Sequence, residues 1–174
     1  MSRPGPAPVR RAVAMTIAIV AFLLAGATAA TAPAVRPATP EEFAREIASL
    51  RGQVVMLNVW ATWCVPCLKE IPDLLKLEDE LAGRGFVLLG LSIDEPADAA
   101  RVEAFRQKYF VAFRSLVRNT TDMDAAVSVV DPAWNEVVPT TYLIGRDGRM
   151  LTRTQGKKTL EEFRAAALEA LAAD

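Results

Sequence analysis

The chain of 174 residues contains no histidine and only two cysteines. Without histidine, the sequence has no Ser–His or Cys–His nucleophile pair, no histidine zinc site and no histidine proton shuttle. Its 20 lysine and arginine residues are balanced by 21 acids, so the composition offers no basic surface for nucleic acid. The length is that of one domain with a sizeable core. The two cysteines are therefore the first place to look for chemistry.

Acidic residues are absent from residues 1–39, where three arginines are followed by an uncharged run from Ala12 to Val35. A positive start, an apolar stretch and the small residues of AGATAATA are typical of an export signal, cleaved after Ala29 or Ala30. The 19 residues from 12 to 30 are also long enough for an uncleaved anchor. We predict a signal peptide or membrane anchor over residues 1–30. Either one places the domain in the periplasm or at the outer face of the cytoplasmic membrane.

A Pro/Thr/Ala-rich linker is expected over residues 31–39, and residues 40–174 show no second break in composition, which predicts a single domain. Helical patterns cover 39–52, 67–85, 95–110, 121–130 and 159–174, and strand patterns cover 53–60, 86–94, 113–117 and a hairpin over 139–156. The last helix is expected to bury Leu160, Phe163, Ala167, Leu168 and Leu171. A β-α-β unit followed by a β-β-α unit predicts an α/β fold, a central mixed sheet with helices on both faces.

Cys64 and Cys67 are separated by two residues in the sequence WCVPC. A metal site would need about four ligands, which two thiols could supply only in a dimer. A disulfide across so short a loop would remove little entropy from the unfolded chain. The position suits exchange chemistry instead, because Cys64 falls where a strand passes into a helix, whose N-terminus favours a thiolate. Cys67, one turn further along, is placed to resolve a mixed disulfide on Cys64.

The stretches NVWATWCVPC and CLKEIP resemble the active site of the thioredoxin superfamily, in particular its exported TlpA/ResA branch, and the likeness extends over most of the predicted domain. This resemblance implies a thioredoxin-like fold and a redox-active disulfide in which Cys64 is the exposed nucleophile and Cys67 resolves. Pro72 matches the proline that kinks the family's active-site helix. The segment EVVPTTYLI resembles the family's cis-proline loop, which implies a cis Pro139 and a substrate-binding backbone at Val138.

The resemblance also assigns roles to residues around the motif. Cytoplasmic thioredoxins carry a buried aspartate six residues before the first cysteine, where this chain has Asn58, which cannot exchange a proton. Members of the TlpA/ResA branch often carry a glutamate six residues after it, and here that residue is Glu70. Glu70 shares a helix face with Cys67 and is suited to take its proton. The alternative is a solvated glutamate paired with Lys69.

Three tryptophans complete the candidate residues. Trp63, next to the first cysteine, resembles the surface indole with which the family contacts its substrate. Trp60 stands at the end of a predicted strand and is expected in the core, and Trp134 is expected to serve packing.

The sequence therefore predicts an exported thiol:disulfide oxidoreductase that reduces protein disulfides, acts as a monomer and needs neither cofactor nor metal. The resemblance further implies a membrane thiol-electron donor of the DsbD/CcdA kind, clients such as apocytochrome c or a copper-handling protein, and a role in cytochrome c maturation. A thiol oxidase or isomerase would use the same sulfurs and stays open. A non-catalytic Cu(I)-binding module stays open as well, and so does a thiol peroxidase, although Ala61 stands where such an enzyme wants threonine.

Overall fold

The computed structural model describes Met1 and residues 35–110 and 112–173. Apart from Met1, the predicted signal or anchor segment over residues 1–30 lies outside the described residues, as does the predicted linker up to residue 34. Among the described residues, no helix is both long enough and apolar enough to span a bilayer. The described residues from Val35 onward belong to one folded unit.

Within the described residues, six strands form one sheet in the order β1-β4-β3-β2-β5-β6. They are β1 (Arg36–Ala38), β2 (Val54–Trp60), β3 (Phe86–Ser92), β4 (Ser115–Arg118), β5 (Thr140–Ile144) and β6 (Met150–Gln155). The first four strands are parallel, and β5 and β6 run antiparallel to their neighbours. β2 is buried throughout and β3 nearly so, which explains why their sequences are continuous apolar runs. The mixed sheet predicted from the sequence is confirmed.

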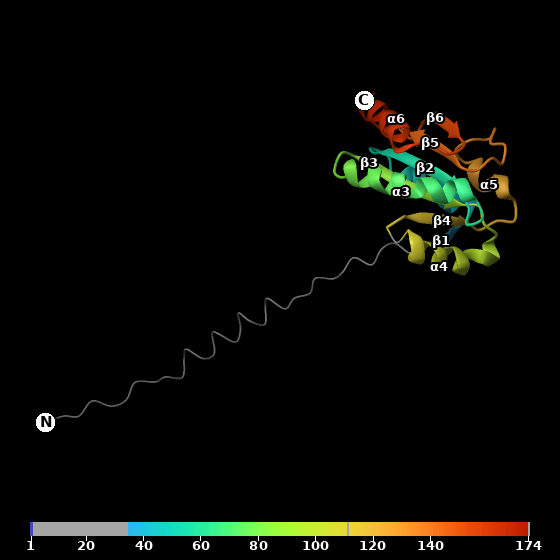
Figure 1. The fold of residues 1–174 in the computed structure, drawn as a ribbon, viewed down its shortest axis with the longest axis horizontal. Coiled ribbons are helices and arrows are strands. Elements are labelled where there is room, and N and C mark those ends of the chain that lie inside the picture. Colours follow the sequence, from blue (N-terminus) through green and yellow to red (C-terminus); the bar gives the residue numbers. More distant parts are fainter. Residues whose placement is uncertain (2–34, 111, 174) are drawn as a thin grey trace. The chain divides into compact units, whose positions relative to one another are not determined.

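The helices lie on both faces of this sheet. They are α2 (Pro40–Ser49), α3 (Val65–Glu80), α4 (Ala99–Tyr109), α5 (Met123–Val127) and α6 (Leu160–Ala172), with a 3-10 turn over Pro96–Asp98. α3 packs against α6, and α2 against α5. Successive side chains of a strand point to opposite faces of the sheet, so the side chains of Thr141 and Tyr142 in β5 lie on opposite faces. In Figure 1, β5, β6 and α6 lie at one end of the sheet, and β1 and α4 lie at the other.

Local sequence signals fix the N-terminal ends of two helices. Thr39 caps α2 and Thr159 caps α6, and in both cases the glutamate three residues later, Glu42 or Glu162, completes a capping box. The hairpin between β5 and β6 turns at Gly148, where φ is +84°, a value that glycine adopts without strain. The elements from α2 to α6 follow one another in the order predicted from the sequence.

The structure corrects three details of the sequence interpretation. Residues 36–38, predicted to be part of a linker, form β1 and pair in parallel with β4, so the folded unit begins before residue 40. The cysteine-bearing helix begins at Val65 and not at Cys67, so Cys67 lies in its first turn. Leu168 of α6 is 37% exposed, whereas Ala170 is buried, because residues spaced like Phe163, Ala167 and Ala170 share the inner face.

The end of β2 is anchored by Trp60, which is fully buried as predicted. Its indole Nε1 donates a hydrogen bond to Oγ of Ser115 at 2.9 Å, and its ring packs at 5.6 Å from that of Phe113. Gly90 of β3 makes room for this packing, since a Cβ atom there would lie 2.6 Å from the Phe113 ring. The strand that leads into the cysteine segment therefore ends in a tightly packed position.

Candidate active site

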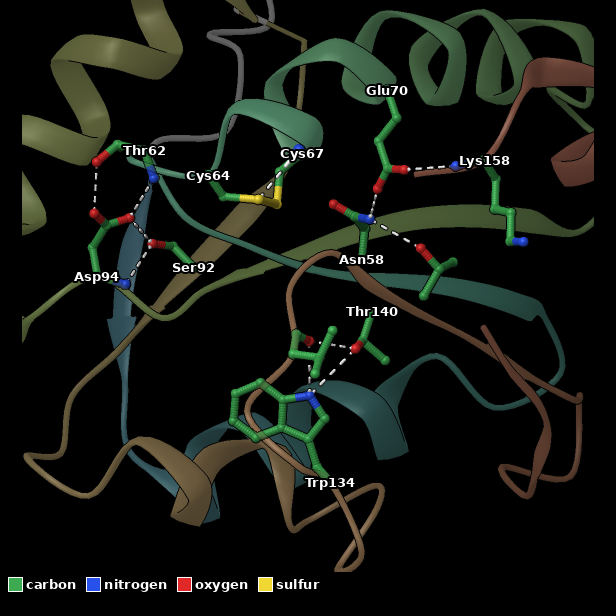
Figure 2. The surroundings of a disulfide bond; sticks show 12 residues. Asn58, Thr62, Cys64, Cys67, Glu70, Ser92, Asp94, Trp134, Thr140 and Lys158 are labelled. Carbon is green, nitrogen blue, oxygen red and sulfur yellow. Dashed lines mark hydrogen bonds between the residues drawn. A yellow bond between two sulfur atoms is a disulfide. The ribbon is translucent and has the colours of Figure 1, made fainter. Parts of the chain in front are cut away.

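Cys64 and Cys67 are joined by a disulfide at the N-terminus of α3, with their Cα atoms 5.3 Å apart. Cys64 is the N-cap residue, and its Sγ accepts a hydrogen bond from the backbone N–H of Cys67 at 3.2 Å (Figure 2). The first turn of a helix has N–H groups without partners inside the helix, and these together with the helix dipole stabilise negative charge. When the pair is reduced, Cys64 therefore occupies the position that favours a thiolate.

The two sulfur-bearing residues differ in access to solvent. Cys64 is 4% exposed and Cys67 is fully buried, so the order of outer and inner cysteine is the expected one, although the exposed part of Cys64 is small. The neighbours Trp63 and Val65 are 60% and 58% exposed and surround Cys64 with apolar surface. Trp63 is therefore a surface indole beside the outer cysteine, where the sequence interpretation placed it. Pro72 lies inside α3, downstream of the pair.

Glu70 is fully buried one turn after Cys67, so it is not a solvated partner of Lys69. Its Oε1 accepts a hydrogen bond from Nδ2 of Asn58 at 2.8 Å, and its Oε2 accepts one from the backbone N–H of Lys158 at 3.2 Å (Figure 2). Asn58, also fully buried on β2, donates a second hydrogen bond to Oγ1 of Thr141 at 3.0 Å. Asn58, six residues before Cys64, and Glu70, three residues after Cys67, thus form one buried polar pair.

Burial raises the pKa of the Glu70 carboxyl from its ordinary value of 4.5 to about 7. The hydrogen bonds from Asn58 and Lys158, and the charges of Lys157 and Lys158, favour the ionised form and offset part of this effect. A carboxyl with a pKa near neutrality both binds and releases a proton readily at that pH. The helix thus carries an ionisable carboxyl with a pKa near neutrality three residues after Cys67.

The raised pKa of Glu70 predicts a fall in stability with increasing pH. The folded protein holds the proton more tightly than the unfolded chain, so this contribution to stability is fully present below pH 4.5 and is lost as pH rises through about 7. The loss attributable to Glu70 is of the order of 3 kcal/mol. Urea unfolding of the oxidised protein across this range measures it, with Glu70→Gln as the reference that lacks the group. Equal pH profiles for the two proteins would contradict the prediction.

The loop before β5 lies at the same end of the sheet as the disulfide. The Val138–Pro139 peptide bond is cis, as the resemblance implied. Thr140 pairs with Val59 near the end of β2, so Pro139 lies beside the point where the chain leaves the sheet toward Cys64. Val138 is half-buried and Pro139 is buried. The structure therefore brings the cysteine pair and the proline loop together, although they are far apart in sequence.

Trp134 holds this loop in place. Its indole is 7% exposed, and its Nε1 lies 3.3 Å from both the carbonyl oxygen of Val137 and Oγ1 of Thr140 (Figure 2). The Thr140 hydroxyl in turn donates to the same carbonyl at 2.6 Å. Trp134 thus serves packing, as expected, and also fixes the backbone just before the cis peptide bond.

Sequence reasoning missed Asp94, which lies just after β3 and is 1% exposed. Its carboxylate accepts hydrogen bonds from the backbone N–H of Thr62 at 2.9 Å, the Thr62 hydroxyl at 2.6 Å and the Ser92 hydroxyl at 2.7 Å (Figure 2). Arg101 adds an ion pair at 3.6 Å. Asp94 therefore fixes the segment that leads to Cys64. The only signal in the sequence is a short polar run after a buried strand, which does not reveal the partner.

Replacement of Asp94 by alanine is expected to loosen this segment. The partly buried N–H of Thr62 would lose its acceptor, which costs up to about 1–3 kcal/mol. Denaturant unfolding measures the stability, and the rate at which a thiol reagent modifies reduced Cys64 reports its positioning. Asp98→Ala is the matched control, because Asp98 also pairs with Arg101, at 2.9 Å, but on the surface. If the two variants behaved alike, the positioning role of Asp94 would be excluded.

A mixed sheet that carries a Cys-x-x-Cys disulfide at a helix N-terminus beside a cis-proline loop defines a protein of the thioredoxin-like fold class. The model of the AhpC/TSA family matches residues 30–152, and the chain belongs to this family. The resemblance to the thioredoxin superfamily and to ResA, stated from the motifs, is confirmed by the proteins to which the chain is similar.

Two curated relatives are the thiol-disulfide oxidoreductases ResA of two Bacillus species. The protein of a Bacillus cereus strain is 32% identical over 118 residues, which cover 68% of this chain and 64% of the relative. That of Bacillus subtilis (strain 168) is 30% identical over 114 residues, which cover 66% of this chain and 59% of the relative. The chain therefore spans less than two thirds of the length of these relatives.

Solved structures confirm the fold. The crystal structure of a thiol:disulfide interchange protein of the thioredoxin family from Chlorobium tepidum TLS matches with a TM-score of 0.62 at 24% identity, covering 72% of this chain and 84% of that chain. The crystal structure of StoA from Bacillus subtilis matches with a TM-score of 0.54 at 22% identity, covering 66% and 82%. The predicted thioredoxin-like fold is thus confirmed.

Proposed function

We propose that this protein is a thiol:disulfide oxidoreductase that reduces disulfides of client proteins through Cys64 and Cys67. The observation that carries the proposal is the disulfide at the N-terminus of α3, with the buried carboxylate of Glu70 one turn behind it. The names of the relatives, thiol-disulfide oxidoreductase ResA, support the same activity.

The proposed cycle begins with the reduced pair. The Cys64 thiolate attacks one sulfur of the client disulfide, forming a mixed disulfide and releasing the other client sulfur as a thiolate, which takes up a proton. Glu70 then accepts the proton of Cys67, and the Cys67 thiolate attacks Sγ of Cys64. The Cys64–Cys67 disulfide forms and the bond to the client breaks. The second client sulfur leaves as a thiolate and takes up the proton held by Glu70, so the client leaves with two thiols. Two electrons have passed from the pair to the client.

The direction we propose is reduction of the client. An ionised Glu70 close to the pair opposes the formation of thiolates through repulsion between like charges. A pair whose reduced form is not stabilised passes its electrons on more readily, whereas DsbA is a strong oxidant because its reduced form is stabilised. The buried position of Glu70 behind Cys67 therefore favours a reductant over an oxidase.

Client binding is proposed at the apolar surface around Cys64. The exposed ring of Trp63 and the backbone of Val138, next to Pro139, are the groups we assign to substrate binding. An extended client segment would pair with the Val138 backbone as with the edge of a sheet, which presents the client disulfide to Cys64.

We further propose that the protein acts outside the cytoplasm, in the periplasm or at the outer face of the cytoplasmic membrane, delivered by a signal or anchor over residues 1–30. In this proposal a linker joins the signal or anchor segment to β1, and the residues from β1 onward form a single domain. A membrane thiol-electron donor of the DsbD/CcdA kind would return electrons to the oxidised pair. Apocytochrome c, which connects the protein to cytochrome c maturation, or a copper-handling protein is the proposed client.

A single-turnover assay tests the activity. Purified protein is reduced with dithiothreitol and freed of the reagent. It is then mixed with native insulin, whose disulfides are intact, and the thiols that appear on insulin are counted. The wild type is expected to transfer one pair of electrons per molecule, and Cys64→Ser is expected to transfer none. Electron transfer to hydrogen peroxide but not to insulin would favour a thiol peroxidase and overturn the proposal.

A further inference from the structure

One atom of the buried polar pair has no hydrogen-bond partner. Oδ1 of Asn58 is fully enclosed and, among the described residues, meets no donor, while Nδ2 of the same amide donates to Glu70 and Thr141. Buried carbonyl oxygens are nearly always paired, so an orphaned acceptor in this position requires an explanation. The only other buried side-chain atom without a partner in the described part of the chain is Oδ1 of Asp124.

The amide of Asn58 is held in one orientation by its neighbours. While Glu70 is ionised, its carboxylate accepts a hydrogen bond at 2.8 Å, which requires the NH2 end of the amide on that side. Oγ1 of Thr141 accepts the second amide hydrogen at 3.0 Å. The oxygen consequently faces the other way, and Figure 2 shows it on the side of the disulfide. The unsatisfied acceptor is therefore directed toward the sulfur atoms.

The oxidised pair cannot supply a donor, because disulfide sulfurs carry no hydrogen. Reduction by a dithiol breaks the S–S bond and transfers two electrons to the pair, while the donor becomes a disulfide. Cys64 is left as a thiolate and Cys67 as a thiol, and the second proton of the dithiol is released to solvent. Cys67 is fully buried, so its new S–H group needs an acceptor inside the protein. Besides the Cys64 sulfur, Figure 2 shows one buried acceptor without a partner on this side of the pair, Oδ1 of Asn58.

We propose that Oδ1 of Asn58 accepts a hydrogen bond from the Cys67 thiol in the reduced protein, so that the amide links the resolving thiol to Glu70 and offsets part of the destabilisation that the Glu70 charge imposes on the reduced pair. The proposal rests on the proposed function, since it concerns the same cysteine pair. Donation from Nδ2 to the Glu70 carboxylate polarises the amide and makes Oδ1 a better acceptor. Cys67 is thereby held protonated behind Cys64 until a mixed disulfide has formed.

The S–H stretching vibration tests this hydrogen bond directly. The chain has two cysteines, so Cys64→Ser leaves Cys67 as the only thiol and gives a single S–H band in the infrared. We expect this band at a lower frequency than in Cys64→Ser/Asn58→Leu, because a donated hydrogen bond weakens the S–H bond. The variant Cys64→Ser/Asn58→Asp keeps a side-chain oxygen at position 58, so its S–H band should stay at the lowered frequency. Thr141→Val, which affects only the donor end of the amide, should leave the band unchanged.

An S–H frequency that does not depend on Asn58 would overturn the proposal, including the case in which a buried water satisfies Oδ1 in both redox states. If the leucine variant does not fold, the wild type itself supplies a second test. Its Asn58 side-chain carbonyl, labelled with carbon-13, should shift its infrared band between the oxidised and reduced states, and an unchanged band would also overturn the proposal. Neither measurement uses a client, so failure of the insulin assay and failure of this inference are separate results.

The same hydrogen bond predicts a change in redox equilibrium. The bond exists only in the reduced protein, so its loss in Asn58→Leu should make the pair harder to reduce. We expect the equilibrium constant with glutathione to change by about tenfold, equivalent to a reduction potential about 30 mV more negative. Thr141→Val is the control and should stay close to the wild type. An unchanged or less negative potential in Asn58→Leu would contradict the inference.

Discussion

Replacement of Cys67 by alanine is expected to abolish turnover and to leave Cys64 joined to a client in a stable mixed disulfide. The variant keeps the outer sulfur at the N-terminus of α3, so the first attack proceeds. The buried sulfur that would release the client is missing. Multiple turnover should fall to the level without protein, while a covalent complex accumulates that reducing agent dissolves. Non-reducing electrophoresis and mass spectrometry of envelope extracts measure the complex and identify the client.

The matched control is the variant with alanine at both cysteines, which should form no complex. Cys64→Ala, which keeps only the buried sulfur, should form far less complex than Cys67→Ala, because Cys67 is inaccessible. If Cys67 trapped clients as well as Cys64 does, the assignment of outer and inner cysteine would be wrong. If only glutathione were found on Cys64, the proposed action on protein disulfides would lose its support.

Replacement of Glu70 by glutamine is expected to slow the release of the client from the mixed disulfide by roughly 10²-fold or more, the usual contribution of a positioned general base. The acting form is the carboxylate, whose pKa is raised to about 7 by burial. In the wild type, the resolution rate should therefore rise as pH increases through about 7. The variant should lack this step. Rapid mixing of a preformed mixed disulfide over a range of pH measures both effects.

Glu78→Gln is the control for this experiment. Glu78 lies on the same helix, burial also raises its pKa, and it accepts a hydrogen bond from the backbone of Leu88, away from the cysteine pair. Its replacement should leave both the rate and its pH dependence unchanged. A Glu70→Gln variant that resolved at the wild-type rate, with the wild-type pH profile, would show that the proton of Cys67 goes elsewhere.

Much of the fold could be predicted because its signals are local. The capping boxes at Thr39 and Thr159 each lie within four residues, and the Asp147-Gly148 turn fixes the hairpin. The position of Cys64 at a helix N-terminus follows from the apolar strand before it and the amphipathic helix after it. These features need no knowledge of distant contacts.

The parts that could not be predicted depend on contacts between residues far apart in the sequence. Asp94 holds Thr62 from 32 residues away, and nothing local marks that pairing. The hydrogen bond between Asn58 and Glu70 joins β2 to α3, and it depends on how the helix packs on the sheet, which the sequence does not show. Arg36–Ala38 resembles a linker in composition, and it becomes a strand because the edge of β4 offers backbone partners.

The reduction potential of the Cys64–Cys67 pair, measured by equilibration with glutathione, tests the central claim most directly. A reductant of protein disulfides requires a potential close to that of thioredoxin, about −270 mV, and this is the expected result. A value close to that of DsbA, about −120 mV, would make the protein an oxidant of thiols and would contradict the account.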